Sequence, residues 1–158
     1  MAKNNIRNGP HTEFHWNGQL YIKTTYKNGK LHGLYEEFDE DGNLYKKINY
    51  KNGEFHGLNE EFYTPTGVAW VRWTYKNGEF HGLFETYNIN GKLKQRGSFK
   101  DGLRNGVWKK YYDTGELFEK GKYIDGIRVG NWEQYLQDGD LMRKWIWKNG
   151  KGELVFQF

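Results

Sequence analysis

Apolar and polar residues alternate along the chain in a pattern that repeats with a fixed period. The segment YKNGKLHGLYEEF begins at Tyr26, close copies begin at Tyr50 and Tyr75, and weaker copies begin at Phe99 and Tyr123. Successive copies are 24 or 25 residues apart. A fixed period of this length is typical of repeat proteins, in which each unit is stabilised by its neighbours. The chain is therefore predicted to be one array of similar units.

Each unit contains two turn signals separated by short apolar segments. One is an Asn-Gly or Asp-Gly pair, as at Asn28-Gly29 and Asp101-Gly102, the dipeptide that most readily adopts the positive φ angles of a tight turn. The other is a mid-unit glycine, such as Gly42 or Gly91. The segments between them, about six or seven residues rich in Tyr, Phe, Trp and Leu, have the length of strands and are too short for average helices. Each unit is predicted to be an antiparallel hairpin.

Stacked hairpins predict an all-β fold: an elongated, curved, single-layer antiparallel β-meander of roughly a dozen strands. With strands about 4.8 Å apart, the ribbon should be on the order of 60 Å long. We expect a single repeat domain over residues 1–158, with a degenerate cap at each end, because terminal units lack a neighbour on one side. The predicted parts are the cap 1–25, the repeats 26–49, 50–74, 75–98, 99–122 and 123–146, and the partial cap 147–158.

Strand parity divides the apolar residues into two sets, because alternate residues of a strand point to opposite faces. The set predicted as the core consists of Leu34, Leu58, Leu83, Val107, Phe38, Phe62, Tyr87, Tyr111, Leu44, Leu93, Leu117, Leu141, Tyr50, Tyr75, Phe99, Tyr123 and Trp147. The opposite set mixes charged residues with aromatic ones, among them Phe84, Trp108 and Trp132. These aromatic residues are expected either to pack together or to form an exposed interaction patch.

Composition restricts the expected cellular location of the protein and the kinds of site that it can contain. Charged residues make up 28% of the chain, the mean hydropathy is −1.01, and no apolar run is long enough to span a bilayer. The start, Met1 to Asn5, has no secretory signal pattern, so a cytoplasmic location is expected. The absence of cysteine excludes disulfides, thiolate metal sites and a cysteine nucleophile.

Other polar residues suggest structural roles. His32, His56 and His81 recur at one repeat position, but equivalent residues should lie about 10 Å apart, too far to share a metal ion. They are expected to support the neighbouring turns. The column of Glu36, Glu60 and Glu85 is expected to be a solvated row that pairs with basic neighbours such as Lys46. No catalytic residue, metal site or cofactor is predicted.

The charge is unevenly distributed along the chain. The formal net charge is +4, yet residues 26–93 carry eight basic and ten acidic side chains, whereas residues 94–128 carry nine basic and five acidic ones. Basic residues interleaved with aromatic rings suit single-stranded nucleic acid, anionic lipid or an acidic protein. Because the overall charge is mild, a protein partner is favoured over nucleic acid and over lipid.

The repeated pattern, aromatic-x-Asn/Asp-Gly-x-x-x-Gly-x-x-x-x-aromatic followed by x-x-x-Gly-x-Leu, resembles the MORN-repeat variant found in bacterial proteins of the YwqK-type antitoxin family. The copies YKNGKLHGLYEEFDEDGNLYKKIN and FKDGLRNGVWKKYYDTGELFEKGK carry it best, and the resemblance covers residues 6–158. It implies a curved sheet of hairpins without catalytic residues, and an antitoxin or immunity protein that neutralises a cognate toxin by direct binding.

Two other functions are compatible with this resemblance. An inhibitor encoded by a mobile element and aimed at a host defence protein is a close variant of the antitoxin, and a scaffold or membrane-surface plate is the second class. We expect an acidic protein partner to contact an aromatic stripe with a basic rim, since aromatic and arginine side chains concentrate binding energy. The predicted contacts are Phe84, Trp108, Trp132, Arg72, Arg96, Lys110 and Arg128. Both a monomer and an edge-to-edge dimer are compatible with the pattern.

Overall fold

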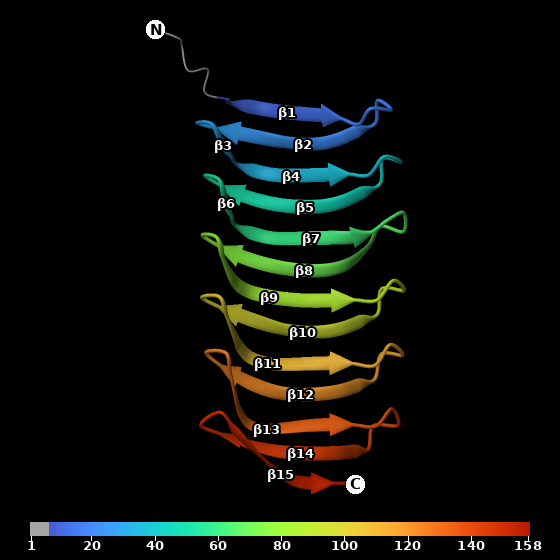
Figure 1. Cartoon of the computed structure of the whole chain (residues 1–158), viewed down its shortest axis with the longest axis vertical. Coiled ribbons are helices and arrows are strands. Elements are labelled where there is room, and N and C mark those ends of the chain that lie inside the picture. The colour runs from blue at the N-terminus through green and yellow to red at the C-terminus, as the bar shows by residue number, and fades with distance from the viewer. Residues whose placement is uncertain (1–6) are drawn as a thin grey trace.

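The computed structural model describes residues 7–158, which form one open antiparallel sheet whose strands follow one another in chain order (Figure 1). Its strands are β1 (Gly9–Phe14), β2 (Leu20–Lys27), β3 (Lys30–Leu31), β4 (Gly33–Phe38), β5 (Leu44–Lys51), β6 (Glu54–Phe55), β7 (Gly57–Tyr63), β8 (Val68–Lys76), β9 (Glu79–Tyr87), β10 (Leu93–Lys100), β11 (Leu103–Tyr111), β12 (Leu117–Ile124), β13 (Ile127–Tyr135), β14 (Leu141–Lys148) and β15 (Lys151–Gln157). The short strands β3 and β6 pair only with β2 and β5.

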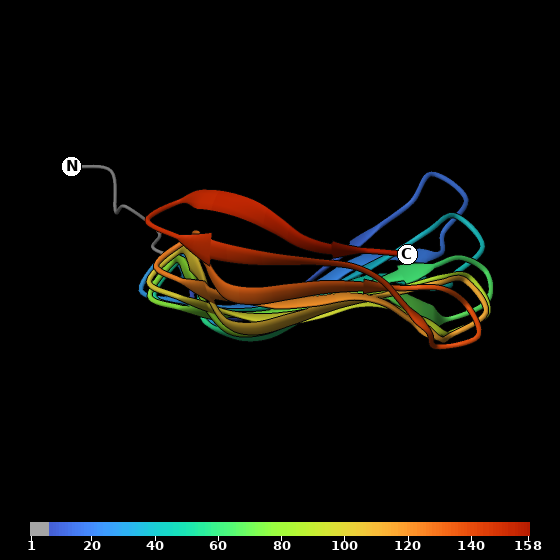
Figure 2. The ribbon, with the colours of Figure 1, turned by 90° about the horizontal axis from the view of Figure 1, so that it is seen from below.

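The predicted all-β hairpin meander is confirmed. Seen along its long axis, the ribbon is one layer thick, and the hairpins at its two ends are rotated relative to each other (Figure 2). Such a twist follows from the right-handed twist of individual strands. No helix in residues 7–158 is long and apolar enough to cross a membrane. Residues 1–6, which belong to the predicted cap and include the start from Met1 to Asn5, lie outside the described residues.

The Asn-Gly and Asp-Gly turns have the predicted conformation. Asn52 and Gly53, for example, have φ angles of 54° and 88°, the pair of positive values that defines the favoured two-residue hairpin turn. These turns also connect neighbouring units, because the N–H of Gly102 donates to the carbonyl oxygen of Phe80, and that of Gly126 to Arg104, each at 2.9 Å. One side of the ribbon is thus a column of hydrogen-bonded turns.

The recurrent histidines support this column of turns. Nδ1 of His32 accepts a hydrogen bond from the backbone N–H of Asn52 at 3.3 Å, and Nδ1 of His56 accepts one from Asn77 at 3.4 Å. Nδ1 of His81 lies 3.3 Å from a carboxylate oxygen of Asp101 in the next turn. Each histidine therefore contacts the turn of the following unit, which is a structural role.

The core lies on one face of the sheet, and the prediction of which first-strand residues form it was wrong. Val107 and Leu58 are 56% and 42% exposed, whereas Trp108 and Trp132 are 3% and 2% exposed. The reason is the register between the strands of a hairpin, which pairs Trp108 with Gly121. Paired residues lie on the same face, and so do residues two apart in a strand, such as Gly121 and Tyr123. Trp108, rather than Val107, therefore shares a face with the second-strand aromatic residue Tyr123. The second-strand prediction is confirmed at Tyr123, which is 7% exposed, and at Phe99 and Trp147, which pack against the cluster that Tyr123 forms with Trp108 and Trp132.

Candidate functional site

The two predicted tryptophans fill gaps that glycines leave on neighbouring strands. A Cβ atom added to Gly97 would lie 2.2 Å from the ring of Trp108, and one added to Gly121 would lie 2.1 Å from the ring of Trp132. Each indole N–H donates to a backbone carbonyl on the preceding strand, at 3.1 Å for Trp108 and 3.3 Å for Trp132. Of the two arrangements expected for the aromatic stripe, the structure thus has the packed one. We call this side of the sheet the tryptophan face.

Aromatic contacts continue from one unit to the next on the tryptophan face. The ring centroid of Phe84 lies 5.5 Å from that of Trp108, and Tyr123 lies between the two tryptophans, 5.9 Å from Trp108 and 5.0 Å from Trp132. Both contacts of Tyr123 are edge-to-face, an arrangement that aromatic pairs favour. This cluster holds β11, β12 and β13 together without a second layer of structure.

Two arginines cover the outer side of this aromatic cluster. The guanidinium carbon of Arg104 lies 4.5 Å from the ring centroid of Trp108, and that of Arg128 lies 4.0 Å from Trp132. Both arginines also donate to the hydroxyl of Tyr123, at 3.2 Å and 3.4 Å. Burial by itself would raise the pKa of Tyr123, but these hydrogen bonds and charges together lower it. The arginines thus stabilise the negative charge that the tyrosine acquires on deprotonation.

Lys110 and Arg128, two of the predicted basic contacts, surround a buried carboxylate on the tryptophan face. Glu119 is 6% exposed; its oxygens lie 3.5 Å from Nζ of Lys110 and 4.0 Å from Arg128, and accept a hydrogen bond from Gln134 at 3.0 Å. A buried carboxylate is stable only when it is paired in this way. Both bases are therefore already partly neutralised within the chain.

Arg72 and Arg96 lie on the opposite side of the sheet, which we call the charged face. Arg72 is adjacent to Trp73 in β8, and Trp73 pairs with Phe84 of the tryptophan face, so Arg72 points the other way. Arg96 pairs with Lys109, the neighbour of Trp108. The expectation that all four bases form one rim around the aromatic stripe was wrong, because alternate strand residues belong to different faces.

A row of charged residues crosses the charged face at right angles to the strands. We call it the charge row; its members are cross-strand neighbours, in the order Lys23, Glu36, Lys47, Glu60, Arg72, Glu85, Arg96, Lys109, Lys120, Glu133 and Lys144. From Lys23 to Arg96 the sign alternates at every step. Opposite charges at directly opposed positions stabilise a sheet, so the row favours this register.

The glutamates of the charge row are less exposed than predicted. Nε of Arg72 donates to Glu60 at 2.7 Å, and Nε of Arg96 lies 3.4 Å from Glu85. Glu85 is 8% exposed and also accepts a hydrogen bond from the hydroxyl of Tyr87 at 2.6 Å. Lys46, the basic neighbour expected for this column, lies on the tryptophan face instead, 4.0 Å from Glu37.

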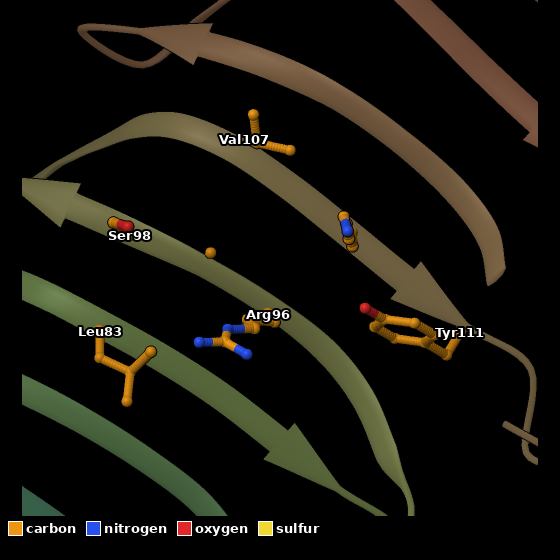
Figure 3. Close-up of a pocket in the computed structure, with 7 residues that line it drawn as sticks. Leu83, Arg96, Ser98, Val107 and Tyr111 are labelled. Atoms are coloured by element: carbon orange, nitrogen blue, oxygen red, sulfur yellow. The ribbon is translucent and has the colours of Figure 1, made fainter.

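The charged face contains an open pocket of about 270 Å³ between β9, β10 and β11. In Figure 3, the guanidinium of Arg96 lies between Leu83 and Tyr111, with Ser98 farther along β10 and Val107 farther along β11. Gly97 and Lys109 complete the lining. The pocket therefore combines apolar walls with two bases, and it suits the binding of an acidic group that has apolar neighbours. Within residues 7–158, no group of three or more His, Asp or Glu side chains is placed to hold a metal ion.

Arg104 and Lys109 are the residues that sequence reasoning missed. Arg104 shares its repeat position with Arg128, four residues before each tryptophan, and this repetition was a usable signal. Lys109 was passed over in favour of Lys110, because only the cross-strand register shows which of two adjacent lysines has acidic neighbours.

The family described as MORN repeat variant matches residues 7–28, 31–52, 80–101 and 104–125, more than half of the chain. Each match spans one hairpin from its first strand to its Asn-Gly or Asp-Gly turn. MORN repeats are in general protein- or membrane-binding modules, and this all-β repeat is typically non-catalytic. No curated protein matches the chain.

Proposed function

Because the chain belongs to the MORN repeat variant family, we propose that it is a protein-binding module with no catalytic activity of its own. It acts as an antitoxin or immunity protein, as the YwqK-type resemblance suggests, and neutralises a cognate toxin in the cytoplasm by direct binding. An inhibitor encoded by a mobile element and directed at a host defence protein would use the same mode of action. Its partner is a protein in either case.

The observation that carries the proposal is the open pocket on the charged face. Arg96 and Lys109 are exposed there beside Val107, which is 56% exposed. Arginine flanked by accessible apolar surface is the composition that concentrates binding energy at protein interfaces. Arg72 lies on the same face, two strands from Arg96, and extends the surface.

Phe84, Trp108 and Trp132 support this surface from the other side of the same sheet. Because Trp108 fills the gap over Gly97, it holds β10 and β11 in a fixed relation, and the side chains of the pocket come from these two strands and β9. A direct contact between the partner and the tryptophan face, including Lys110 and Arg128, stays a prediction.

Coexpression with the polypeptide encoded beside the gene of this chain tests the proposal. We expect that polypeptide to arrest growth when expressed alone, the chain to relieve the arrest, and calorimetry with the purified proteins to give a stoichiometric complex. Relief without a measurable complex would contradict direct binding. A reaction catalysed by the chain, lost after a point substitution, would contradict the non-catalytic role.

A membrane-surface plate is the second candidate, favoured by the excess of basic side chains in residues 94–128. Membrane binding by such plates relies on basic residues that attract anionic lipid over a wide area. The charge row alternates in sign from β2 to β10, so most of the charged face lacks this property. Cosedimentation with phosphatidylserine vesicles at physiological salt would favour the plate, and its absence would favour the protein-binding module.

A further inference from the structure

The alternation of the charge row breaks at Lys109. Its cross-strand neighbours are Arg96 on one side and Lys120 on the other, and within residues 7–158 it is the only base of the row with basic neighbours on both sides. Like charges at directly opposed positions destabilise a sheet. Arg96 is paired with Glu85 and Lys120 with Glu133, at 3.4 Å and 3.0 Å. Lys109 has no ion pair or hydrogen bond to any side chain among the described residues.

We propose that Lys109 and Arg96 form a binding site for the carboxylate of a glutamate or aspartate side chain on a protein partner. The inference rests on the proposed function, since it takes the partner to be a protein. In the alternating part of the row, Lys47 and Arg72 each have a glutamate on both sides. At Lys109 both of these carboxylates are missing, and the partner supplies one.

The walls of the pocket favour an acidic segment of a polypeptide over a simple anion. Leu83 and Val107 present methyl groups beside the two bases, and Tyr111 contributes its ring. A phosphate ion would leave these apolar groups in water, whereas a peptide buries them with the residues that flank its carboxylate. Lys122, which pairs with Val107 on the same face, extends the positive surface toward further acidic residues of the segment.

Charge reversal at Lys109 tests whether the fold lacks a carboxylate that compensates this lysine. Lys109→Glu restores the alternation between Arg96 and Lys120, and thermal unfolding should shift upward by about 2 °C. The matched control is Lys47→Glu, because Lys47 occupies the same row with glutamates on both sides, and its melting temperature should fall. A lower melting temperature for Lys109→Glu than for the unmodified chain would show that Lys109 is compensated within the fold, which overturns the proposal.

Binding is measured by titrating the isotope-labelled full chain with an acetylated, amidated peptide that has one glutamate between two leucines. We expect amide shifts confined to β9, β10 and β11, and affinity about tenfold weaker for Lys109→Gln but unchanged for Lys47→Gln. Equal binding of the peptide with glutamine in place of glutamate would overturn the proposal. So would shifts of the same amides by inorganic phosphate at equal affinity, or Lys109-dependent binding to phosphatidylserine vesicles.

The outcomes separate this inference from the proposed function. Peptide binding at Lys109 together with failure to relieve any toxin would retain the carboxylate site and reject the antitoxin role. Relief of toxicity that Lys109→Glu leaves intact, in a chain that does not bind the peptide, would retain the antitoxin role and reject the site.

Discussion

The C-terminal and N-terminal halves of the ribbon have the same backbone repeat but different packing. In the C-terminal half, Trp108 and Trp132 lie over Gly97 and Gly121. In the N-terminal half the same repeat position is occupied by Asn59, which is 1% exposed and pairs with Trp73. The side chain of Asn59 accepts a hydrogen bond from the backbone N–H of Asn49 at 2.7 Å.

The difference shows that the repeat accommodates different combinations of side-chain size at one cross-strand position. A tryptophan opposes a glycine in one half, and a medium-sized asparagine opposes a tryptophan in the other. Apolar burial is concentrated where tryptophan meets glycine, because Trp108, Tyr123 and Trp132 form the hydrophobic cluster of the described residues. We therefore expect the C-terminal half to be the more stable one.

Truncation of the buried indole should have the largest effect. Trp132→Ala is expected to destabilise the fold by about 3–5 kcal/mol, because it removes a fully buried ring and leaves a cavity over Gly121. Asn59→Ala, at the equivalent position, should cost only about 1–2 kcal/mol, through the unsatisfied N–H of Asn49. Denaturant unfolding of both variants measures the difference, and equal losses would contradict a packing difference between the halves.

The same tryptophan variants test the contact role predicted from the sequence. Trp132→Ala should lower stability without a separable effect on the affinity of the remaining folded protein, whereas Trp108→Ala also removes the ring that holds the pocket strands β10 and β11. If Trp132→Ala stays folded and loses partner binding in calorimetry, the tryptophan face is a contact surface.

A methyl group at the glycine under Trp108 should have the next largest effect. Alanine is normally more favourable than glycine within a strand, yet Gly97→Ala should destabilise by about 2 kcal/mol, because the new Cβ would displace the ring. Ser98→Ala, at the adjacent exposed position on the other face, is the matched control and should change little. Combining Gly97→Ala with Trp108→Leu should recover part of the loss; an additive loss would argue against the ring as the cause.

The turns should not differ between units, because their backbone conformation repeats. Gly78 and Gly102 have φ angles of 81° and 77° with no atom within 4 Å of an added Cβ. Replacing either by valine should cost about 1–2 kcal/mol through backbone strain alone, and Lys76→Ala should cost much less. Thermal melts of the three variants compare them; a loss at Lys76 as large as at Gly78 would contradict the strained turn.

The smallest expected effect is a difference in pH dependence between Glu133 and Glu61. The hydrogen bond from Tyr135 lowers the pKa of Glu133 more than burial raises it, and Lys120 lowers it further. Its stabilising contribution is therefore present above the unfolded pKa of about 4.3 and is lost as the pH falls through the folded pKa. Glu133→Gln should lower the melting temperature at pH 7 and leave it nearly unchanged at pH 3.

Glu61 is the matched case of opposite sign. Burial raises its pKa, assisted by Glu37 and opposed by Lys46. A raised pKa means that the protonated form fits the fold better, so its contribution is present below about pH 4.3 and is lost as the pH rises through the folded pKa. Glu61→Gln should therefore raise the melting temperature above that of the unmodified chain at pH 7, and this gain should be smaller at pH 3. A melting temperature below that of the unmodified chain at pH 7 would show that Lys46 outweighs burial.

Local sequence predicted the hairpins because each turn contains its own signal. Asn-Gly and Asp-Gly pairs have the same backbone conformation wherever they stand, and the segments between them have room only for strands. The candidate site was less predictable. Arg96 was predicted because it lies on the same stretch of chain as the aromatic stripe, whereas Lys109 beside it was not, since the two belong to different strands and their opposition depends on register.

The periodic pattern by itself determined the all-β class, the turns and the order of the strands. Which face became the core was decided only by the tertiary structure. Alternation with a period of two is symmetric, so Val107 and Trp108 are equivalent until the neighbouring strand is placed. The register sets Trp108 over Gly97 and Lys109 beside Arg96, and one residue of slip would exchange the two faces. Contacts between strands, which no single segment contains, therefore selected both the buried indole and the uncompensated lysine.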